Sequence, residues 1–145
     1  GVTREEMIEA GRKLKRCGIL CSATLISGLG GRQRLREHAI ASASLISAIK
    51  PDYVGFLTLM IDPQAPVYSK IVSGELELLN PEDVVEEMKL FLENVDSEGT
   101  VFRSNHASNY VILKGTLNED IPSMLAYLRQ VEEQGKYREE RWRRF

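Results

Sequence analysis

The stretch TLISGLGGR, residues 24–32, is an apolar run that ends in three glycines within four residues. Together with residues 19–23, the apolar part predicts a strand buried on both faces, because it lacks polar alternation. Glycine loses more conformational freedom on folding than any other residue. A cluster of glycines therefore indicates either a special backbone geometry, such as a tight strand-to-helix turn, or a ligand that lies against the main chain.

Strands and amphipathic helices alternate along the rest of the chain. Thr3 and Glu6 form a capping box at the start of the first helix, which is expected to end at Gly18. The run YVGFLTLMI, residues 53–61, predicts a second buried strand, and residues 99–104 predict a weaker third one. Further helices are expected at residues 32–50, at 67–74, from Pro81 onward, and after Asn118, which is expected to be the N-cap.

This order predicts an α/β fold with about three parallel strands and flanking helices. The loops that leave the strands (GLGG, DPQAP and SNHASN) should share one edge of the sheet, at the carboxyl ends of the strands. A complete eight-stranded barrel takes roughly 250 residues. Residues 1–145 are therefore predicted to form a single domain that is a fragment of a partial TIM-type (β/α) barrel, or a subunit whose sheet edge is covered by another chain.

Two features of the predicted fragment concern its exposed parts. Its sheet edges would be free, so self-association through them is expected. Residues 134–145 are expected to form a solvated helix extension or tail, because glutamates interrupt their basic charge.

Composition and charge exclude several classes of protein. A net charge of −2 and a pI near 5.8 argue against a nucleic-acid-binding surface over the whole domain. No apolar run is long enough to cross a membrane, and the first residues do not resemble a signal peptide, which favours a cytoplasmic protein. Cys17 and Cys21 are interpreted as small buried apolar residues, since a metal site needs further thiolates or histidines nearby.

The glycine turn matches neither of the common phosphate-binding motifs. The third glycine of a dinucleotide fingerprint would fall at Gln33, and the lysine and serine of a P-loop are absent. His38 lies between charged neighbours in the middle of a predicted helix, so it is interpreted as a surface residue. The turn alone therefore does not assign a ligand.

A polar loop, within FRSNHASNY at residues 102–110, follows the third predicted strand. An ordinary polar turn explains such residues, and so does a set of hydrogen-bonding groups aimed at a polar substrate. No Ser–His–Asp or Cys–His pair can be assigned, because no acidic partner is identifiable. The candidate substrate-binding residues are Arg103, Ser104, Asn105, His106 and Asn109.

Three segments together resemble the radical S-adenosylmethionine (SAM) superfamily: ATLISGLGGR at residues 23–32, LTLMIDPQAPVYSKI at 57–71 and FRSNHASNYVILKGTL at 102–117. The resemblance is closest to the iron–sulfur oxidoreductases related to oxygen-independent coproporphyrinogen oxidase. It extends over almost the whole chain but covers only the C-terminal half of that family's partial (β/α)₆ barrel. The glycine stretch corresponds to the fifth strand of the barrel, and residues 57–66 to the sixth.

The resemblance implies contacts to the adenine of SAM. In the family, the fifth strand carries the pattern glycine-x-isoleucine-x-glycine-x-x-glutamate. Ile26 and Gly28 match it, whereas Thr24 replaces the first glycine and Gly31 the glutamate. The implied cofactor-binding residues are Ile26, Gly28, Gly30, Gly31, Met60 and Ile61, and the implied substrate contacts lie in the polar loop.

One departure from the family limits what this chain is expected to do. The cysteine motif that binds the [4Fe–4S] cluster is absent, and Cys17 and Cys21 do not replace it. The resemblance implies that SAM and the cluster work together in an intact parent protein, where SAM is cleaved reductively to a 5′-deoxyadenosyl radical that abstracts hydrogen from a small-molecule or unknown substrate. The chain would pair there with the missing N-terminal half of the barrel and be inactive alone. A small α/β nucleotide- or protein-binding module without redox chemistry is the alternative.

Overall fold

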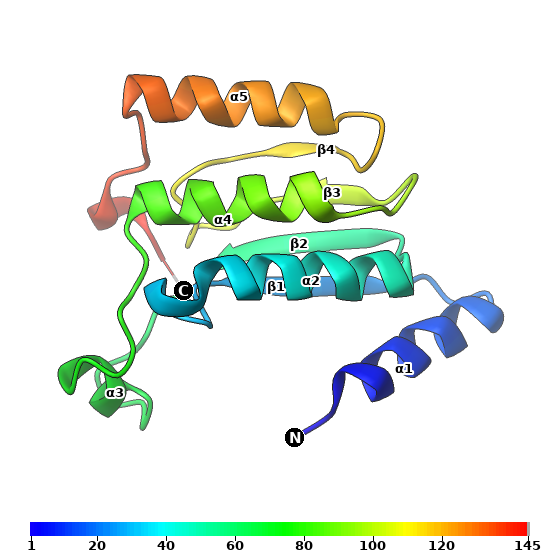
Figure 1. The fold of residues 1–145 in the computed structure, drawn as a ribbon, viewed down its shortest axis with the longest axis horizontal. Helices are drawn as coiled ribbons and strands as arrows, with labels where there is room; N and C mark the ends of the chain where they lie inside the picture. The colour runs from blue at the N-terminus through cyan, green and yellow to red at the C-terminus, as the bar shows by residue number, and fades with distance from the viewer. Residues whose placement is uncertain (145) are drawn as a thin grey trace.

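A four-stranded sheet organises residues 1–144, which the computed structural model describes (Figure 1). Strands β1 (Ser22–Ser27), β2 (Tyr53–Thr58) and β3 (Val101–Arg103) pair in parallel, in that order. Strand β4 (Lys114–Thr116) pairs antiparallel with β3. The predicted α/β fold with three parallel strands is confirmed. The sheet is open, with β1 and β4 at its two edges.

The helices are distributed unevenly around this sheet. Figure 1 shows α2 (Leu35–Ile49), α4 (Pro81–Asn94) and α5 (Ile121–Gln134) side by side in one layer against one face of the sheet. Helix α1 (Arg4–Arg16) packs against α2 and slants away from the sheet. The remaining helical segments are α3 (Tyr68–Val72) and the 3₁₀ turns η1 (Arg32–Arg34) and η2 (Glu140–Trp142). Within residues 1–144, no helix combines the length and apolar character needed to cross a bilayer.

The helix boundaries follow local capping chemistry. The capping box of Thr3 and Glu6 is present, and Asn80 forms a second one with Asp83 just before the proline that begins α4. The expected N-cap at Asn118 is wrong. Asn118 adopts a φ of +68° in the preceding turn and its side chain accepts a hydrogen bond from the backbone N–H of Ser97. The N-cap is Asp120, and α5 begins at Ile121.

Three phenylalanines form the centre of the core, between the sheet and the helix layer. The ring centroid of Phe56 on β2 lies 5.8 Å from that of Phe91 on α4 and 5.9 Å from that of Phe102 on β3. Phe91 and Phe102 are fully buried. Because each large aromatic ring buries much apolar surface, this cluster holds β2, β3 and α4 together.

The opposite face of the sheet is less covered than the sequence pattern predicts. Leu25 and Val54 face the helices and are buried, whereas Thr24 is exposed and Tyr53 is 45% exposed. The prediction that β1 and β2 are buried on both faces is therefore wrong, because the helices pack on one face only. The central position of β2, between β1 and β3, agrees with its apolar sequence.

The C-terminal segment folds back onto the molecule. Helix α5 ends at Gln134, where Gly135 adopts a φ of +60° as the C-cap. Arg143 is only 6% exposed, so the tail is not solvated along its length as expected. Its buried guanidinium donates a hydrogen bond to the carbonyl oxygen of Ser108 in the polar loop.

Candidate functional site

The three unusual loops leave the sheet at the same edge. Strands β1, β2 and β3 are parallel, so residues 28–31, 59–67 and 104–109 all follow carboxyl ends of strands. The expected juxtaposition of these loops is confirmed. In α/β proteins, ligands bind most often at this edge.

An open cavity of about 320 Å³ lies at this edge, between the end of β1, the end of β2 and the loop after β3. Its walls are mostly apolar side chains, and its polar groups come from the end of β2 and from the loop after β3. A concave apolar surface with a few polar groups is typical of small-molecule sites. The lining residues are Ile26, Leu57, Thr58, Leu59, Met60, His106 and Ser108.

His106 is held in a defined tautomer by Ser108. The backbone N–H of Ser108 donates to Nδ1 of His106 at 3.2 Å, and the Ser108 Oγ lies 2.9 Å from the same nitrogen. The Ser108 hydroxyl in turn accepts the backbone N–H of Thr58 at 3.2 Å, which leaves its proton free to point at His106. Since Nδ1 is an acceptor, the neutral ring carries its proton on Nε2. His106 therefore brings one N–H donor to the cavity.

Two other residues of the polar loop are fully buried and bonded within the chain. The Ser104 hydroxyl accepts the backbone N–H of Leu113 at 2.8 Å. The Asn109 amide donates to the carbonyl oxygen of Phe56 at 2.7 Å and accepts the Thr58 hydroxyl at 3.0 Å. These bonds fasten the loop to β2 and to the segment before β4. A role for either residue as a substrate contact stays a prediction.

The remaining predicted site residues lie outside the cavity lining. Arg103 is exposed, and its guanidinium donates to the carbonyl oxygen of Phe102 at 2.8 Å. Asn105 is exposed, and Ile61 is partly exposed just beyond Met60. Among the predicted residues, the structure thus brings together Ile26, Met60 and His106.

The C-terminal tail fixes the polar loop from outside, which the sequence pattern did not reveal. Arg138 donates from Nη1 to three carbonyl oxygens of the loop, those of residues 106, 107 and 109, over 3.0–3.1 Å. Arg143 donates from Nε to the carbonyl oxygen of Ser108 at 2.6 Å. Both arginines satisfy backbone acceptors, so they set the conformation of the loop that carries His106.

Tyr110 anchors the tail through a polar and a π contact. Its hydroxyl donates to a Glu140 carboxylate oxygen at 2.8 Å, and the Arg143 guanidinium carbon lies 4.0 Å from its ring centroid. Burial, together with the bond to Glu140, raises the pKa of Tyr110 to about 12. Burial acts to raise the pKa of Glu140, but hydrogen bonds from Arg143 and Tyr110 outweigh it and hold that pKa below its ordinary value.

Backbone conformation accounts for two of the three glycines. Gly28 has a φ of +92° and Gly31 a φ of +64°, a region that L-residues rarely adopt. A Cβ at Gly30 would approach the Cβ of His38 to 3.0 Å and the carbonyl oxygen of Arg34 to 3.2 Å, so a larger residue there would be tightly packed. The tight-turn interpretation of the glycine stretch therefore explains Gly28 and Gly31. None of the three glycines lines the cavity.

A buried carboxylate stabilises this turn. Glu87 on α4 is 1% exposed and accepts the backbone N–H of Gly28 at 2.9 Å and the hydroxyl of Ser27. Its other oxygen lies 2.5 Å from Nδ1 of His38, whose side chain is 24% exposed. The interpretation of His38 as a surface residue is wrong, because the ring reaches back to this carboxylate. The sequence contained a signal, since Glu87 is three residues after Val84, on the apolar face of α4.

The described residues do not form a site for an iron–sulfur cluster. Cys21 is buried beside α1, as expected, but Cys17 is exposed. Within residues 1–144, no group of three or more His, Cys, Asp or Glu side chains converges as a metal site would require. No chemical step through a cluster is therefore assigned to this chain.

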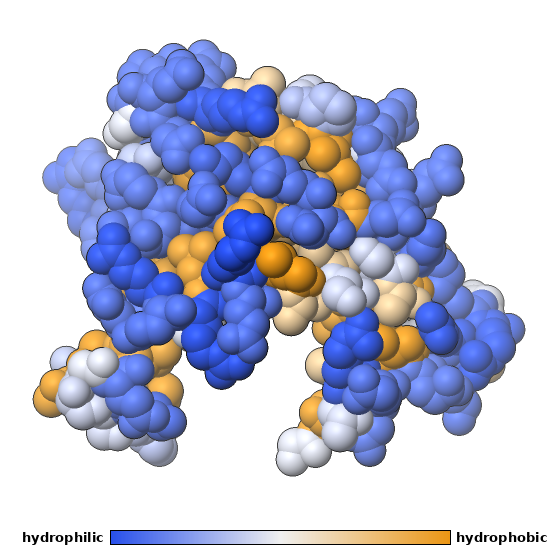
Figure 2. Space-filling model, in the orientation of Figure 1, coloured by the Kyte–Doolittle hydropathy of each residue, from blue (hydrophilic) through white to orange (hydrophobic). Residues whose placement is uncertain are grey.

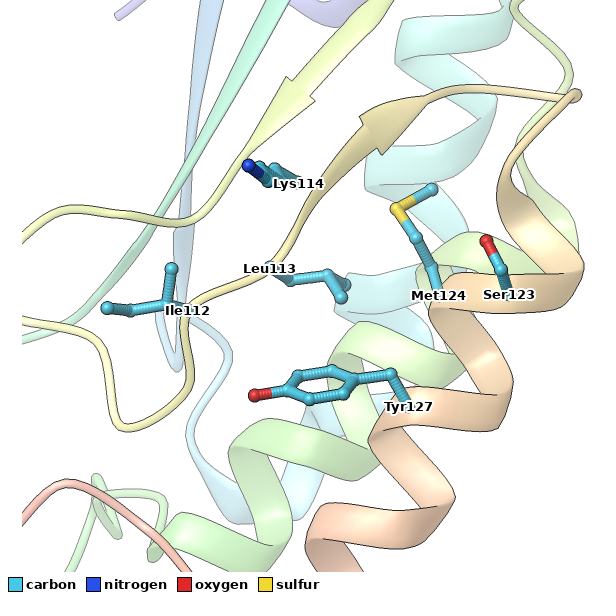
Figure 3. Close-up of a pocket in the computed structure, with 6 residues that line it drawn as sticks. All are labelled: Ile112, Leu113, Lys114, Ser123, Met124 and Tyr127. Carbon is cyan, nitrogen blue, oxygen red and sulfur yellow. The ribbon is translucent and has the colours of Figure 1, made fainter.

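A second hollow lies at the other edge of the sheet, which is formed by β4. Figure 3 shows it between β4 and α5, with Tyr127 and Met124 extending from the helix toward Leu113. The amine of Lys114 and the hydroxyl of Ser123 lie at separate ends of this hollow. Because its polar groups do not converge, it lacks the character of a binding site.

Comparison with protein-family models, with curated proteins and with solved structures finds no match to this chain. The cavity at the carboxyl ends of the strands, with the residues around it, is therefore the basis for assigning a function.

Proposed function

We propose that the chain is the C-terminal part of a radical SAM iron–sulfur oxidoreductase, where it supplies the adenine-binding wall and a substrate loop. One observation carries the proposal. Ile26, Met60 and His106 come from the three separate segments that resemble this superfamily, and all three line a single cavity. The parallel sheet brings the carboxyl ends of these three segments to one edge, and the residues that meet there supply the apolar wall and polar groups that an adenine site would use.

The cavity residues have distinct roles in this proposal. Ile26, Leu57 and Met60 offer apolar surface to the face of a purine ring. The Nε2–H of His106 donates a hydrogen bond to an acceptor atom of the cofactor or substrate, and Ser108 holds the ring for that purpose. When bound, SAM would supply the reactive group, and this chain would position it and exclude water.

The uncovered parts of the sheet support a partner that completes the barrel. A parallel strand presents alternate backbone groups to its two sides. The carbonyl oxygens of Cys21 and Ser27 accept hydrogen bonds from Tyr53 and Leu59, so the backbone of Thr24 faces the free edge. A mostly apolar hollow of about 350 Å³ lies along this edge. The surface there is recessed between the lobes of α1 and α3 in Figure 2. A neighbouring strand of the N-terminal half would cover it.

Methionine methyl groups give a direct test of the adenine site. The chain holds four methionines, and only Met60 lines the cavity. With ¹³C-methyl methionine, titration with S-adenosylhomocysteine should move the Met60 signal and leave that of Met7, on α1, unchanged. Met60→Ala should weaken binding, whereas Met7→Ala serves as the matched control outside the cavity. Binding that leaves the Met60 signal unmoved contradicts the proposal.

The parent gene separates the proposal from its alternative. A cysteine-x-x-x-cysteine-x-x-cysteine motif upstream of this segment would supply the cluster ligands that residues 1–144 lack. An upstream region without such a motif would favour the nucleotide-binding module, in which the cavity binds a ligand without redox chemistry.

A further inference from the structure

The Glu87–His38 pair forms a second polar site on the helix side of the same edge. An ionised carboxylate only accepts hydrogen bonds, and Glu87 meets three donors: the Ser27 hydroxyl, the Gly28 N–H and Nδ1 of His38. A carboxylate that is 1% exposed needs such partners, since burial of an unpaired charge is costly. Glu87 therefore fixes both the turn and the orientation of the His38 ring.

This arrangement determines which nitrogen of His38 is available. With Nδ1–H donated to Glu87, the neutral ring has its lone pair on Nε2. Within residues 1–144, no side chain or backbone group hydrogen-bonds Nε2. An imidazole whose first nitrogen is held by a carboxylate presents the second as an oriented proton acceptor, the arrangement found in many catalytic and binding histidines.

His38 lines an open hollow of about 270 Å³ that does not include the cavity residues Met60 and His106. The Arg34 guanidinium donates to both carboxylate oxygens of Glu37 at 2.8 and 2.6 Å. This ion pair places hydrogen-bond donors and acceptors on one side of the hollow. The other side of the hollow consists of the apolar side chains of Leu29 and Ala41 and the backbone of Gly30. The lining residues are Leu29, Gly30, Arg34, Glu37, His38 and Ala41.

We propose that this hollow binds a hydroxyl-rich ligand of monosaccharide size, with one ligand hydroxyl donating to Nε2 of His38. The hollow is smaller than a typical drug-sized site. Sugars present hydroxyls around the ring and C–H groups on its faces, which match the charged side and the apolar side of the hollow. Glu87 is the positioning residue. The ligand would be either a free sugar or the ribose of a nucleoside, since both offer the same hydroxyls.

The two histidines of the chain allow each site to be observed separately. In long-range ¹H–¹⁵N spectra, His38 should show the proton on Nδ1 and His106 the proton on Nε2. D-ribose should shift Nε2 of His38 and leave His106 unchanged. Adenosine should shift His38 if the ribose of a nucleoside is the ligand. If D-ribose shifts His38 but adenosine shifts only His106, the ligand is a free sugar. An unchanged His38 with both ligands overturns the sugar site.

His38→Asn separates binding from folding. The Asn amide reaches the position of Nδ1–H and keeps the bond to Glu87, but it has no acceptor at the position of Nε2. Ribose binding, followed by the amide signals of Leu29 and Ala41, should weaken about tenfold while the melting temperature stays close to wild type. In Glu87→Ala the tautomer preference of His38 should be lost. Ribose binding that is unchanged in His38→Asn contradicts the proposal.

Discussion

Arg143 donates from Nε to the carbonyl oxygen of Ser108 over 2.6 Å and thereby joins the C-terminal tail to the loop that follows β3. Ser108 is the residue whose hydroxyl and N–H orient His106. A buried side chain near the end of the chain therefore controls a group that lines the cavity. A residue outside the cavity lining thus helps to set the geometry of the candidate site.

Loss of this contact should loosen the polar loop. In Arg143→Ala, the carbonyl oxygen of Ser108 loses its partner in a buried environment, which costs about 1–3 kcal/mol. Amide hydrogen exchange in residues 104–110 should become about tenfold faster, with little change in α2. Arg141→Ala is the matched control, because the Arg141 side chain is exposed and contacts its tail neighbours Glu139 and Trp142. Equal exchange in both variants would contradict this role of Arg143.

The anchoring of the tail should weaken at high pH. The folded state holds the pKa of Tyr110 near 12, above the ordinary value of 10.0, so folding favours the protonated phenol. This stabilisation is complete below pH 10 and is lost as the pH rises toward about 12. Urea unfolding should show a free energy of unfolding that falls more steeply over this range in wild type than in Tyr110→Phe. Parallel pH profiles for the two proteins would exclude the coupling.

Much of the sheet could be predicted because its signals are local. The apolar runs of β1 and β2 are longer than those of a typical surface segment, so they predict buried strands. Strands that alternate with helices along the chain predict a parallel sheet. The capping box at Thr3 lies within four residues. These features depend on neighbours in sequence, so the pattern alone reveals them.

The remaining features depend on contacts between distant residues. Strand β4 has three residues and no apolar pattern of its own, so only its pairing with β3 defines it. Arg143 bonds a carbonyl oxygen 35 residues away, and any backbone offers such an acceptor. His38 and Glu87 are 49 residues apart. The position of Glu87 on the apolar face of α4 was the one signal in the sequence. The hydrogen-bond partners of Glu87 became evident only from the fold.

The turn after β1 should require glycine for its backbone conformation. An added Cβ at Gly28 would meet Leu59 at an ordinary 3.5 Å, so the φ of +92° is the obstacle. Gly28→Ala should lower the free energy of unfolding by about 1–2 kcal/mol. Gly55→Ala is the control, because Gly55 lies in β2 without a positive φ, and its new Cβ would find contacts no closer than 3.8 Å. That control should be neutral or more stable by up to about 1 kcal/mol. Similar losses in both variants would argue against the conformational explanation.

The free edge of β1 should cause the isolated chain to self-associate. Thr24 is exposed on this edge strand, and apolar residues line the hollow beside it. Sedimentation should therefore detect association that increases with protein concentration. Thr24→Lys should reduce it, because lysine on an edge opposes strand addition. Gln130→Lys adds the same charge on the exposed side of α5 and should leave association unchanged. A chain that stays monomeric at every concentration would contradict this expectation.

Substitution of the two asparagines of the polar loop should have different effects on the free energy of unfolding. Asn109 is fully buried and joins the loop to β2 through Phe56 and Thr58, so Asn109→Ala leaves two buried groups without their partner. We expect a loss of about 1–3 kcal/mol in the free energy of unfolding. Asn105 is exposed, and Asn105→Ala should stay within about 0.5 kcal/mol of wild type. Thermal melts measure both, and titration with S-adenosylhomocysteine measures binding by the folded fraction. If Asn109→Ala keeps wild-type stability but loses binding, Asn109 contacts the ligand directly and the buried bonds to β2 are not its main role.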